Sequence, residues 1–185
     1  MIEWLKNIDA KLLLLINGHH SPLMDFIMYW ASNKLAWTPL YIVFAFLFYK
    51  RMGMGIWKLL LSVAVLILLS DQLSVLIKDA VMRYRPCHNL FLQSKIILLN
   101  RYCGGLYGFV SSHAANSSAL ALFLIFVSGK KIKGLAVLLF AYCLLIACSR
   151  IYLGAHYPSD VIGGWMLGFL LAWIVFYFYE KIAAG

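Results

Sequence analysis

The run from Ile56 to Ile77 constrains the fold more than any other part of the sequence, because it is long, largely apolar and contains only one acid, Asp71. Roughly 20 apolar residues in a helix cross the ~30 Å hydrocarbon core of a bilayer. The whole chain has the same character: 64% of its 185 residues are hydrophobic and only 12% are charged. Soluble domains carry about 25% charged residues. The sequence therefore predicts an all-α integral membrane bundle.

Apolar runs predict about five full spans, at 35–49, 56–77, 114–128, 132–151 and 158–179. Residues 1–34 carry charged residues and histidines too often for a simple crossing. We therefore expect one or two amphipathic helices there, lying in the membrane interface and joined at 17–22. The chain is long enough for one bundle, so we predict a single domain over 1–185, with spans and active-site loops in 35–181.

Lysines and arginines gather at three places that five spans bring to the same side of the membrane. Short cytoplasmic loops carry an excess of these residues, so we predict that three groups are cytoplasmic: Lys50, Arg51 and Lys58; Lys130, Lys131 and Lys133; and Lys181. The segments 79–112 and 150–158 then lie outside, which in a bacterial inner membrane is the periplasmic side. The net charge is +9, but the basic residues form no continuous stripe, so we expect no nucleic-acid partner.

Polar residues that are costly in a membrane collect at the outer ends of the predicted helices. They come from sequence-distant places and reach one membrane level, which indicates a convergent site: Lys78, Arg83 and Arg85; Ser111, Ser112, His113 and Asn116; Ser149, Arg150, His156 and Asp160. Arginine binds phosphate oxygens in a bidentate manner, and lysine supplies a point charge. Lys78, Arg85 and Arg150 therefore predict a site for a phosphoryl group.

Two histidines give this site a chemistry beyond anion binding. The i to i+4 spacing of His156 and Asp160 lets the carboxylate reach the imidazole, orient it and leave Nε2 as a nucleophile. His113, on a different helix, can then protonate the leaving oxygen as a general acid. The alternative for each residue alone is an ordinary helix-end role, such as a snorkelling cation or a carboxylate that complements the helix dipole.

Three spaced blocks within residues 78–160 resemble the type 2 phosphatidic acid phosphatase (PAP2) superfamily, whose pattern is K-x6-R-P, then P-S-G-H, then S-R-x5-H-x3-D. The first block (78–86) and the third (149–160) match in full. The middle block (110–113) reads V-S-S-H, with Val and Ser in place of Pro and Gly. The resemblance implies a six-helix core and a reaction that needs no metal or cofactor.

The resemblance also implies a role for each matching residue. His156 would be the nucleophile that forms a phosphohistidine, Asp160 would orient it, and His113 would act as an acid and then as a base. The phosphate would be held by Lys78, Arg85, Ser111, the backbone N–H of Ser112, and Arg150. The hydroxyl of Ser112 is a further candidate donor that glycine lacks.

A site at the outer membrane–water boundary selects a substrate whose tail stays in lipid, so the expected partner is a lipid phosphate or diphosphate in the bilayer. The resemblance narrows this to undecaprenyl diphosphate, phosphatidylglycerophosphate, phosphatidic acid or the 1-phosphate of lipid A. The small size of the chain favours undecaprenyl diphosphate. Two alternatives stay open: a phosphotransferase that passes the phosphate to an acceptor alcohol, and an anion or lipid transporter that cleaves no bond.

The remaining features give structural expectations. Asp71 should make a polar contact with a neighbouring helix. Cys87 and Cys103 lie in the outward segment, where they form a disulfide or remain two free thiols. The apolar insert 91–100 between them should dip into the interface and shape the substrate entrance. A stripe of small residues in the last run predicts close helix packing: Gly164, Gly168 and Ala172.

Overall fold

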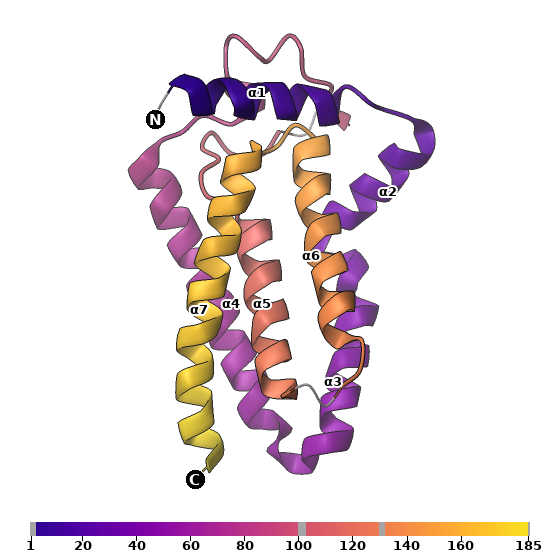
Figure 1. Cartoon of the computed structure of the whole chain (residues 1–185), viewed down its shortest axis with the longest axis vertical. Coiled ribbons are helices and arrows are strands. Elements are labelled where there is room, and N and C mark those ends of the chain that lie inside the picture. Colours follow the sequence, from indigo (N-terminus) through magenta and orange to yellow (C-terminus); the bar gives the residue numbers. More distant parts are fainter. Residues whose placement is uncertain (1–2, 100–102, 130–131, 185) are drawn as a thin grey trace.

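The computed structural model describes residues 3–99, 103–129 and 132–184, and this part of the chain is helical. Outside one isolated bridge between Tyr84 and Tyr107, the described residues form no β structure, so the predicted all-α fold is confirmed. The long helices lie side by side in a bundle, and α1 lies across one of its ends (Figure 1). The α-helices are α1 (Glu3–Asn17), α2 (Pro22–Ser32), α3 (Thr38–Met52), α4 (Ile56–Val81), α5 (Ser112–Ser128), α6 (Leu135–Tyr152) and α7 (Pro158–Ala184).

Three helical stretches are long and apolar enough to cross a membrane, at 34–81, 135–152 and 158–183, and α5 is a shorter apolar helix. The first stretch folds back at Gly53, which has a φ of 55°, so α3 and α4 form a hairpin (Figure 1). The five predicted spans thus correspond to α3–α7. Several boundaries differ from the prediction by a few residues. Helices α3 and α6 begin at Thr38 and Leu135 and not at residues 35 and 132, and Gly134 precedes α6 in a left-handed conformation.

The two ends of the bundle differ in what they carry. The turn between α3 and α4, the connection between α5 and α6, and the C-terminal end of α7 lie at one end (Figure 1). Lys50 and Arg51 occupy the last turn of α3, and Lys181 the last turn of α7, so these predicted neighbours share that end. Lys130 and Lys131 lie outside the described residues. The opposite end carries α1, the segment between α4 and α5, and the connection between α6 and α7.

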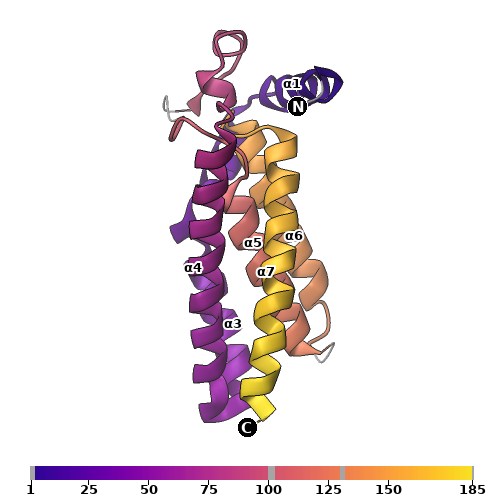
Figure 2. The same cartoon turned by 90° about the vertical axis from the view of Figure 1, so that its left-hand side faces the viewer.

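Glycines on α7 let α5 approach it very closely, as the small-residue stripe predicts. A β-carbon on Gly164 would lie 2.6 Å from the Ser111 backbone oxygen, and one on Gly168 would lie 2.4 Å from that of Ala115. Both distances are too short for any real carbon, so the two backbones can pack this tightly only at glycine. Helices α5 and α7 lie side by side (Figure 2). The contact matters for the site because α5 carries His113 and α7 carries Asp160.

The N-terminal residues form α1 and α2, as expected for 1–34. One face of α1 points into the protein: Asp9, Leu13 and Asn17 are at most 2% exposed and follow each other at four-residue spacing. Trp4 and Leu15, in contrast, are 67% and 60% exposed, which fits a helix that lies at a membrane surface. Helix α1 therefore forms a cap on the end of the bundle that holds the polar residues.

The segment between α4 and α5 is closed at its base. The N–H of Arg85 donates to Leu106 (3.0 Å), and that of Gly108 donates to the Arg83 carbonyl (2.8 Å). Cys87 and Cys103 form a disulfide, with their Cα atoms 6.0 Å apart. Within the insert 91–100, Leu92 and Ile96 are buried against Leu13 of α1 and the end of α6, whereas Phe91 and the preceding Leu90 are exposed. Asn100 lies outside the described residues.

Candidate active site

His156 lies in the short connection between α6 and α7 and is almost fully buried, at 1% exposure. Its Nε2 is 3.1 Å from Nη1 of Arg85, which also donates to the Ala155 carbonyl at 3.1 Å. An arginine can only donate, so Nε2 is the acceptor and the ring proton sits on Nδ1. Nδ1 lies 3.5 Å from Oδ2 of Asp160, so the predicted pair is brought within ion-pair distance without a hydrogen bond between these two atoms.

The charges around His156 favour its neutral form. Burial lowers its pKa well below the usual 6.5, and the positive charges of Arg85, Arg150 and Lys78 lower it further. These three cations come from the segment after α4, from α6 and from α4, and all were predicted to hold a phosphate. The structure thus brings together an unprotonated imidazole and the cations that would bind an anionic substrate beside it.

Asp160 is held from two directions. It lies in the first turn of α7, fully buried, and its Oδ2 accepts from the Tyr157 N–H at 3.0 Å. Its Oδ1 accepts from Nη1 of Arg83 at 2.7 Å. Arg83 lies at the end of a predicted span, and the sequence pattern assigns it no role. The signal that could have identified it is a second arginine inside the first block, two residues before Arg85.

Ser112, which replaces the glycine of the pattern, is the first residue of α5. Among the described non-glycine residues only Met82 has a positive φ, so the serine side chain is accommodated without backbone strain. Its hydroxyl accepts from Nζ of Lys78 and lies 2.6 Å from Oγ of Ser74 on α4. The hydroxyl therefore links the predicted phosphate-binding lysine to the start of α5.

Ser111 caps the N-terminus of α5. Its Oγ accepts from the Ala114 N–H, and its own N–H donates to the Asp160 carbonyl at 2.9 Å. This hydrogen bond ties the start of α5 to the first turn of α7. Helix N-termini attract anions through their unpaired N–H groups, so the start of α5 suits the phosphate position predicted for Ser111 and Ser112.

His113 lines a cavity of about 380 Å³. Ser32, at the end of α2, lines the same cavity and accepts from Nη1 of Arg150, which brings Arg150 to this polar end. Sequence reasoning missed Ser32, because it lies outside the three blocks. Most of the remaining wall is apolar and comes from α3 to α6, including Phe44, Phe48, Leu59, Leu60, Leu120 and Ile146.

Asp71 makes the polar contact that was expected of it. Its Oδ1 accepts from Nδ2 of Asn116 on the neighbouring helix α5, at 3.4 Å. Ser74, one turn later, donates to the Asp71 carbonyl at 2.8 Å. Asp71 therefore contributes to packing between α4 and α5 beneath the site.

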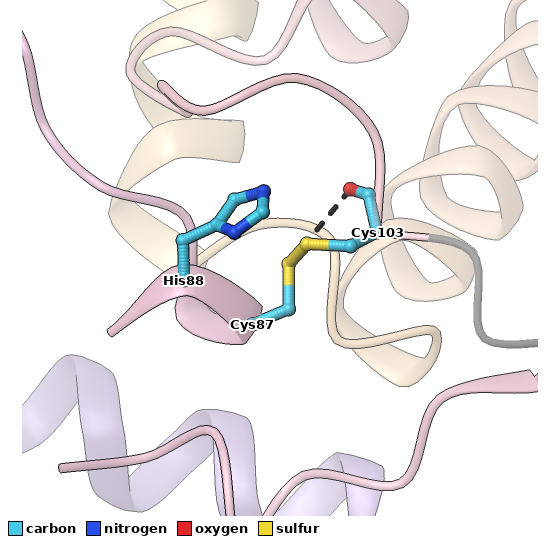
Figure 3. Close-up of side chains that lie close together, drawn as sticks. All are labelled: Cys87, His88 and Cys103. Atoms are coloured by element: carbon cyan, nitrogen blue, oxygen red, sulfur yellow. Dashed lines mark hydrogen bonds between the residues drawn. A yellow bond between two sulfur atoms is a disulfide. The ribbon is translucent and has the colours of Figure 1, made fainter. Parts of the chain in front are cut away.

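Cys87, His88 and Cys103 form the one group of possible metal ligands in the described part of the chain (Figure 3). Metal binding requires the thiolate form of cysteine, and both sulfurs are committed to the disulfide. The bond instead fixes the wall of the site: a β-carbon on Gly104, next to Cys103, would touch the guanidinium carbon of Arg85 at 3.4 Å. The disulfide therefore holds a segment that packs directly on Arg85.

Known relatives resemble the chain over most of its length. The lipid A 4'-phosphatase of Bacteroides thetaiotaomicron is 34% identical over 100% of this chain and 82% of that protein. The lipid A 4'-phosphatase of Porphyromonas gingivalis is 32% identical over 96% of this chain and 75% of that protein. An undecaprenyl-diphosphatase of Sulfolobus acidocaldarius is 39% identical, but over 38% of this chain and 31% of that protein.

The fold is also known. The crystal structure of a transmembrane PAP2 type phosphatidylglycerolphosphate phosphatase from Bacillus subtilis superimposes with a TM-score of 0.73, at 22% identity, over 98% of this chain and 89% of that one. The family model of the PAP2 superfamily matches residues 55–183, which include every residue of the three blocks. The chain therefore belongs to the PAP2 superfamily and is a membrane lipid phosphatase.

Proposed function

We propose that this phosphatase hydrolyses a phosphate monoester of a lipid A-type lipid, and that the reaction passes through a phosphohistidine on His156. The observation that carries the proposal is the environment of His156: a buried imidazole whose Nε2 accepts from Arg85, with the Asp160 carboxylate facing Nδ1. A nucleophile in phosphoryl transfer needs a lone pair, a nearby cation for the phosphate oxygens and a partner for the charge that develops on it.

The proposed reaction has two steps. Nε2 of His156 attacks phosphorus while the bond to the leaving oxygen breaks, and His113 donates a proton to that oxygen. Arg85 turns from the imidazole to the phosphate oxygens, which Lys78 and Arg150 also bind. A water molecule then attacks the phosphohistidine and loses its proton to His113. The products are the dephosphorylated lipid and inorganic phosphate, and His156 is restored.

The choice of lipid rests on the relatives and on the cavity. Both lipid A 4'-phosphatases match nearly the whole chain, whereas the undecaprenyl-diphosphatase matches a short part of it. The cavity that begins at His113 continues between apolar residues of α3 to α6, which suits an acyl chain whose head group lies at the site. Undecaprenyl diphosphate, the substrate favoured by sequence, remains the second candidate.

The proposal also includes the setting of the reaction. Residues 1–185 act as one domain in the inner membrane, with the site on the periplasmic side. The support is the distribution of basic residues: Lys50, Arg51 and Lys181 lie at the end of the bundle opposite the site, as expected of a cytoplasmic end. Lipid phosphates of the outer leaflet would then reach the site laterally.

The test is hydrolysis by the purified protein in detergent, with a chelator present. Lipid A carrying both 1- and 4'-phosphates, undecaprenyl diphosphate and phosphatidylglycerophosphate are compared for release of inorganic phosphate, and mass spectrometry locates the phosphate lost. We expect loss from lipid A, no product with His156→Ala, and full activity with His19→Ala, an exposed histidine on the α1–α2 connection.

Each contrary outcome removes a different part of the proposal. Faster release of phosphate from undecaprenyl diphosphate than from lipid A would make undecaprenyl diphosphate the preferred substrate. Phosphate found on an added acceptor alcohol would identify a phosphotransferase. Binding of the lipids without release of phosphate would favour a transporter, and full activity of His156→Ala would rule out the nucleophile.

A further inference from the structure

Asp9 is a buried carboxylate that belongs to none of the three blocks. It lies on α1, outside the five long helices, and is 2% exposed. Its Oδ1 accepts from the Ser159 N–H at 3.0 Å, and its Oδ2 accepts from the Ser159 hydroxyl. Oδ2 also accepts from Nη2 of Arg83 at 2.7 Å. A carboxylate buried this deeply needs strong partners, and the partners of Asp9 are the two residues that adjoin Asp160.

Arg83 joins Asp9 to Asp160. While Nη2 binds Asp9, Nη1 donates to Oδ1 of Asp160 at 2.7 Å and to the Ser159 hydroxyl at 2.6 Å. The face of the guanidinium lies 4.0 Å from the ring centroid of Tyr157. A planar guanidinium can bind two carboxylates along different edges at once, which a lysine ammonium does not do with a fixed geometry.

This arrangement fixes the rotation of the Asp160 carboxylate. Oδ1 is held by Arg83 and Oδ2 accepts from the Tyr157 N–H, so Oδ2 faces Nδ1 of His156, 3.5 Å away. It also divides the charge of Arg83 between two carboxylates. Asp160 therefore shares this cation with Asp9, and the position of both carboxylates depends on one guanidinium.

We infer that Asp9 and Arg83 are positioning residues for the reaction, through which helix α1 sets the orientation and charge of Asp160 beside His156. The inference rests on the proposed roles of His156 and Asp160. It gives α1 a part in the chemistry as well as in the cap of the bundle. The charged groups that face His156 from the packed elements are Lys78, Arg85, Arg150 and Asp160, with Arg83 and Asp9 behind Asp160.

The test compares two changes that remove one negative charge from the same helix. Asp9→Asn keeps the size of the side chain and an oxygen that can accept from Ser159, but it leaves Arg83 to Asp160 alone. Glu3→Gln is the matched control, because Glu3 is exposed and pairs with Lys6 at 2.9 Å. In metal sites, loss of a residue that orients a ligand costs about 10- to 100-fold in activity, and we use the same scale for the residues that orient Asp160.

We expect kcat to fall by about tenfold or more in Asp9→Asn, with KM within about twofold and recovery in Asp9→Glu, because the lost interaction serves the transition state. Arg83→Lys, which keeps the charge without the fork, should show the same loss of kcat. Melting temperatures are measured for every variant. If Asp9→Asn does not fold, the result with Arg83→Lys decides.

The inference is overturned if folded Asp9→Asn or Arg83→Lys keeps the kcat of the wild type, or if Glu3→Gln loses as much. A lower melting temperature with unchanged kcat would make the cluster purely structural. Failure of the proposed function would look different, since the wild-type protein would then release no phosphate or would not depend on His156.

Discussion

The substitution Gly168→Ala should slow the reaction although Gly168 lies far from the reacting groups. It is eight residues from Asp160 along α7, which is about 12 Å at 1.5 Å for each residue. The new β-carbon would lie 2.4 Å from the Ala115 carbonyl oxygen, whereas an ordinary contact begins at 3.4 Å. The Ser118 hydroxyl, at 2.1 Å, can rotate away, but the backbone oxygen cannot. Helices α5 and α7 must therefore separate by about 1 Å at this level, the difference of those two distances.

The expected magnitudes for Gly168→Ala follow from this shift. Overpacking costs about 1–3 kcal/mol, and alanine returns about 1 kcal/mol through its higher helix propensity, so the loss of stability should be modest. A displacement of about 1 Å between reacting groups can cost on the order of 100-fold in rate. We therefore expect a large fall in kcat with a small fall in melting temperature.

The assay is phosphate release at saturating lipid substrate, with melting followed on the same preparation. Gly163→Ala is the comparison, because its β-carbon meets the ends of the Val110 and Phe109 side chains, at 2.9 and 3.0 Å, and these can move. We expect it to lose less activity. Wild-type kcat in Gly168→Ala would refute the reasoning that this contact sets the distance between His113 and Asp160.

Four further outcomes are expected. Burial lowers the pKa of His156, so its protonation should not limit kcat/KM until the pH is below 6.5. The histidine of the unfolded chain takes up a proton at higher pH than the folded one, so stability should fall as the pH drops below 6.5. A pH series of activity and of melting temperature checks both outcomes. Cys87→Ser should lower the unfolding free energy by about 3 kcal/mol, measured by denaturation. It should also raise KM, measured by kinetics, because the disulfide holds the segment that packs on Arg85. A non-reducing peptide map of the wild type should show the bond. His113→Ala should slow esters of low-pKa alcohols least, in a leaving-group series. An impermeant thiol reagent should label Lys95→Cys but not Lys133→Cys in intact cells.

Much of the fold could be predicted because its determinants are local. Apolar runs of membrane length predict α3–α7, and the glycines at 164 and 168 predict that the last helix packs closely against a neighbour. The start of α6 was missed because Ile132 is as apolar as the helix that follows, and the helix is delayed by the conformation of Gly134. Hydropathy alone does not detect such a backbone effect.

The candidate site divides in the same way. Spacing identifies residues such as His156, just before α7, and Asp160, in its first turn, because they are only four positions apart in the sequence. It cannot identify Asp9, whose partner Ser159 lies 150 positions away, or Ser32, which meets Arg150 only because α2 lies against α6. Contacts of this kind depend on how α1 and α2 pack against the other helices. The periodic pattern of residues 1–34 does not identify the residues that they contact.

The closed base of the segment between α4 and α5 has a consequence for how such enzymes can diversify. The pairing of Tyr84 with Tyr107 and the disulfide hold both ends of the segment next to Arg85, while Leu90 and Phe91, between the two cysteines, are exposed. Insertions are tolerated best at exposed tips whose ends are held in place. The tip can therefore lengthen or change sequence, and so acquire new contacts with different lipid head groups, while the chemistry beneath it stays the same.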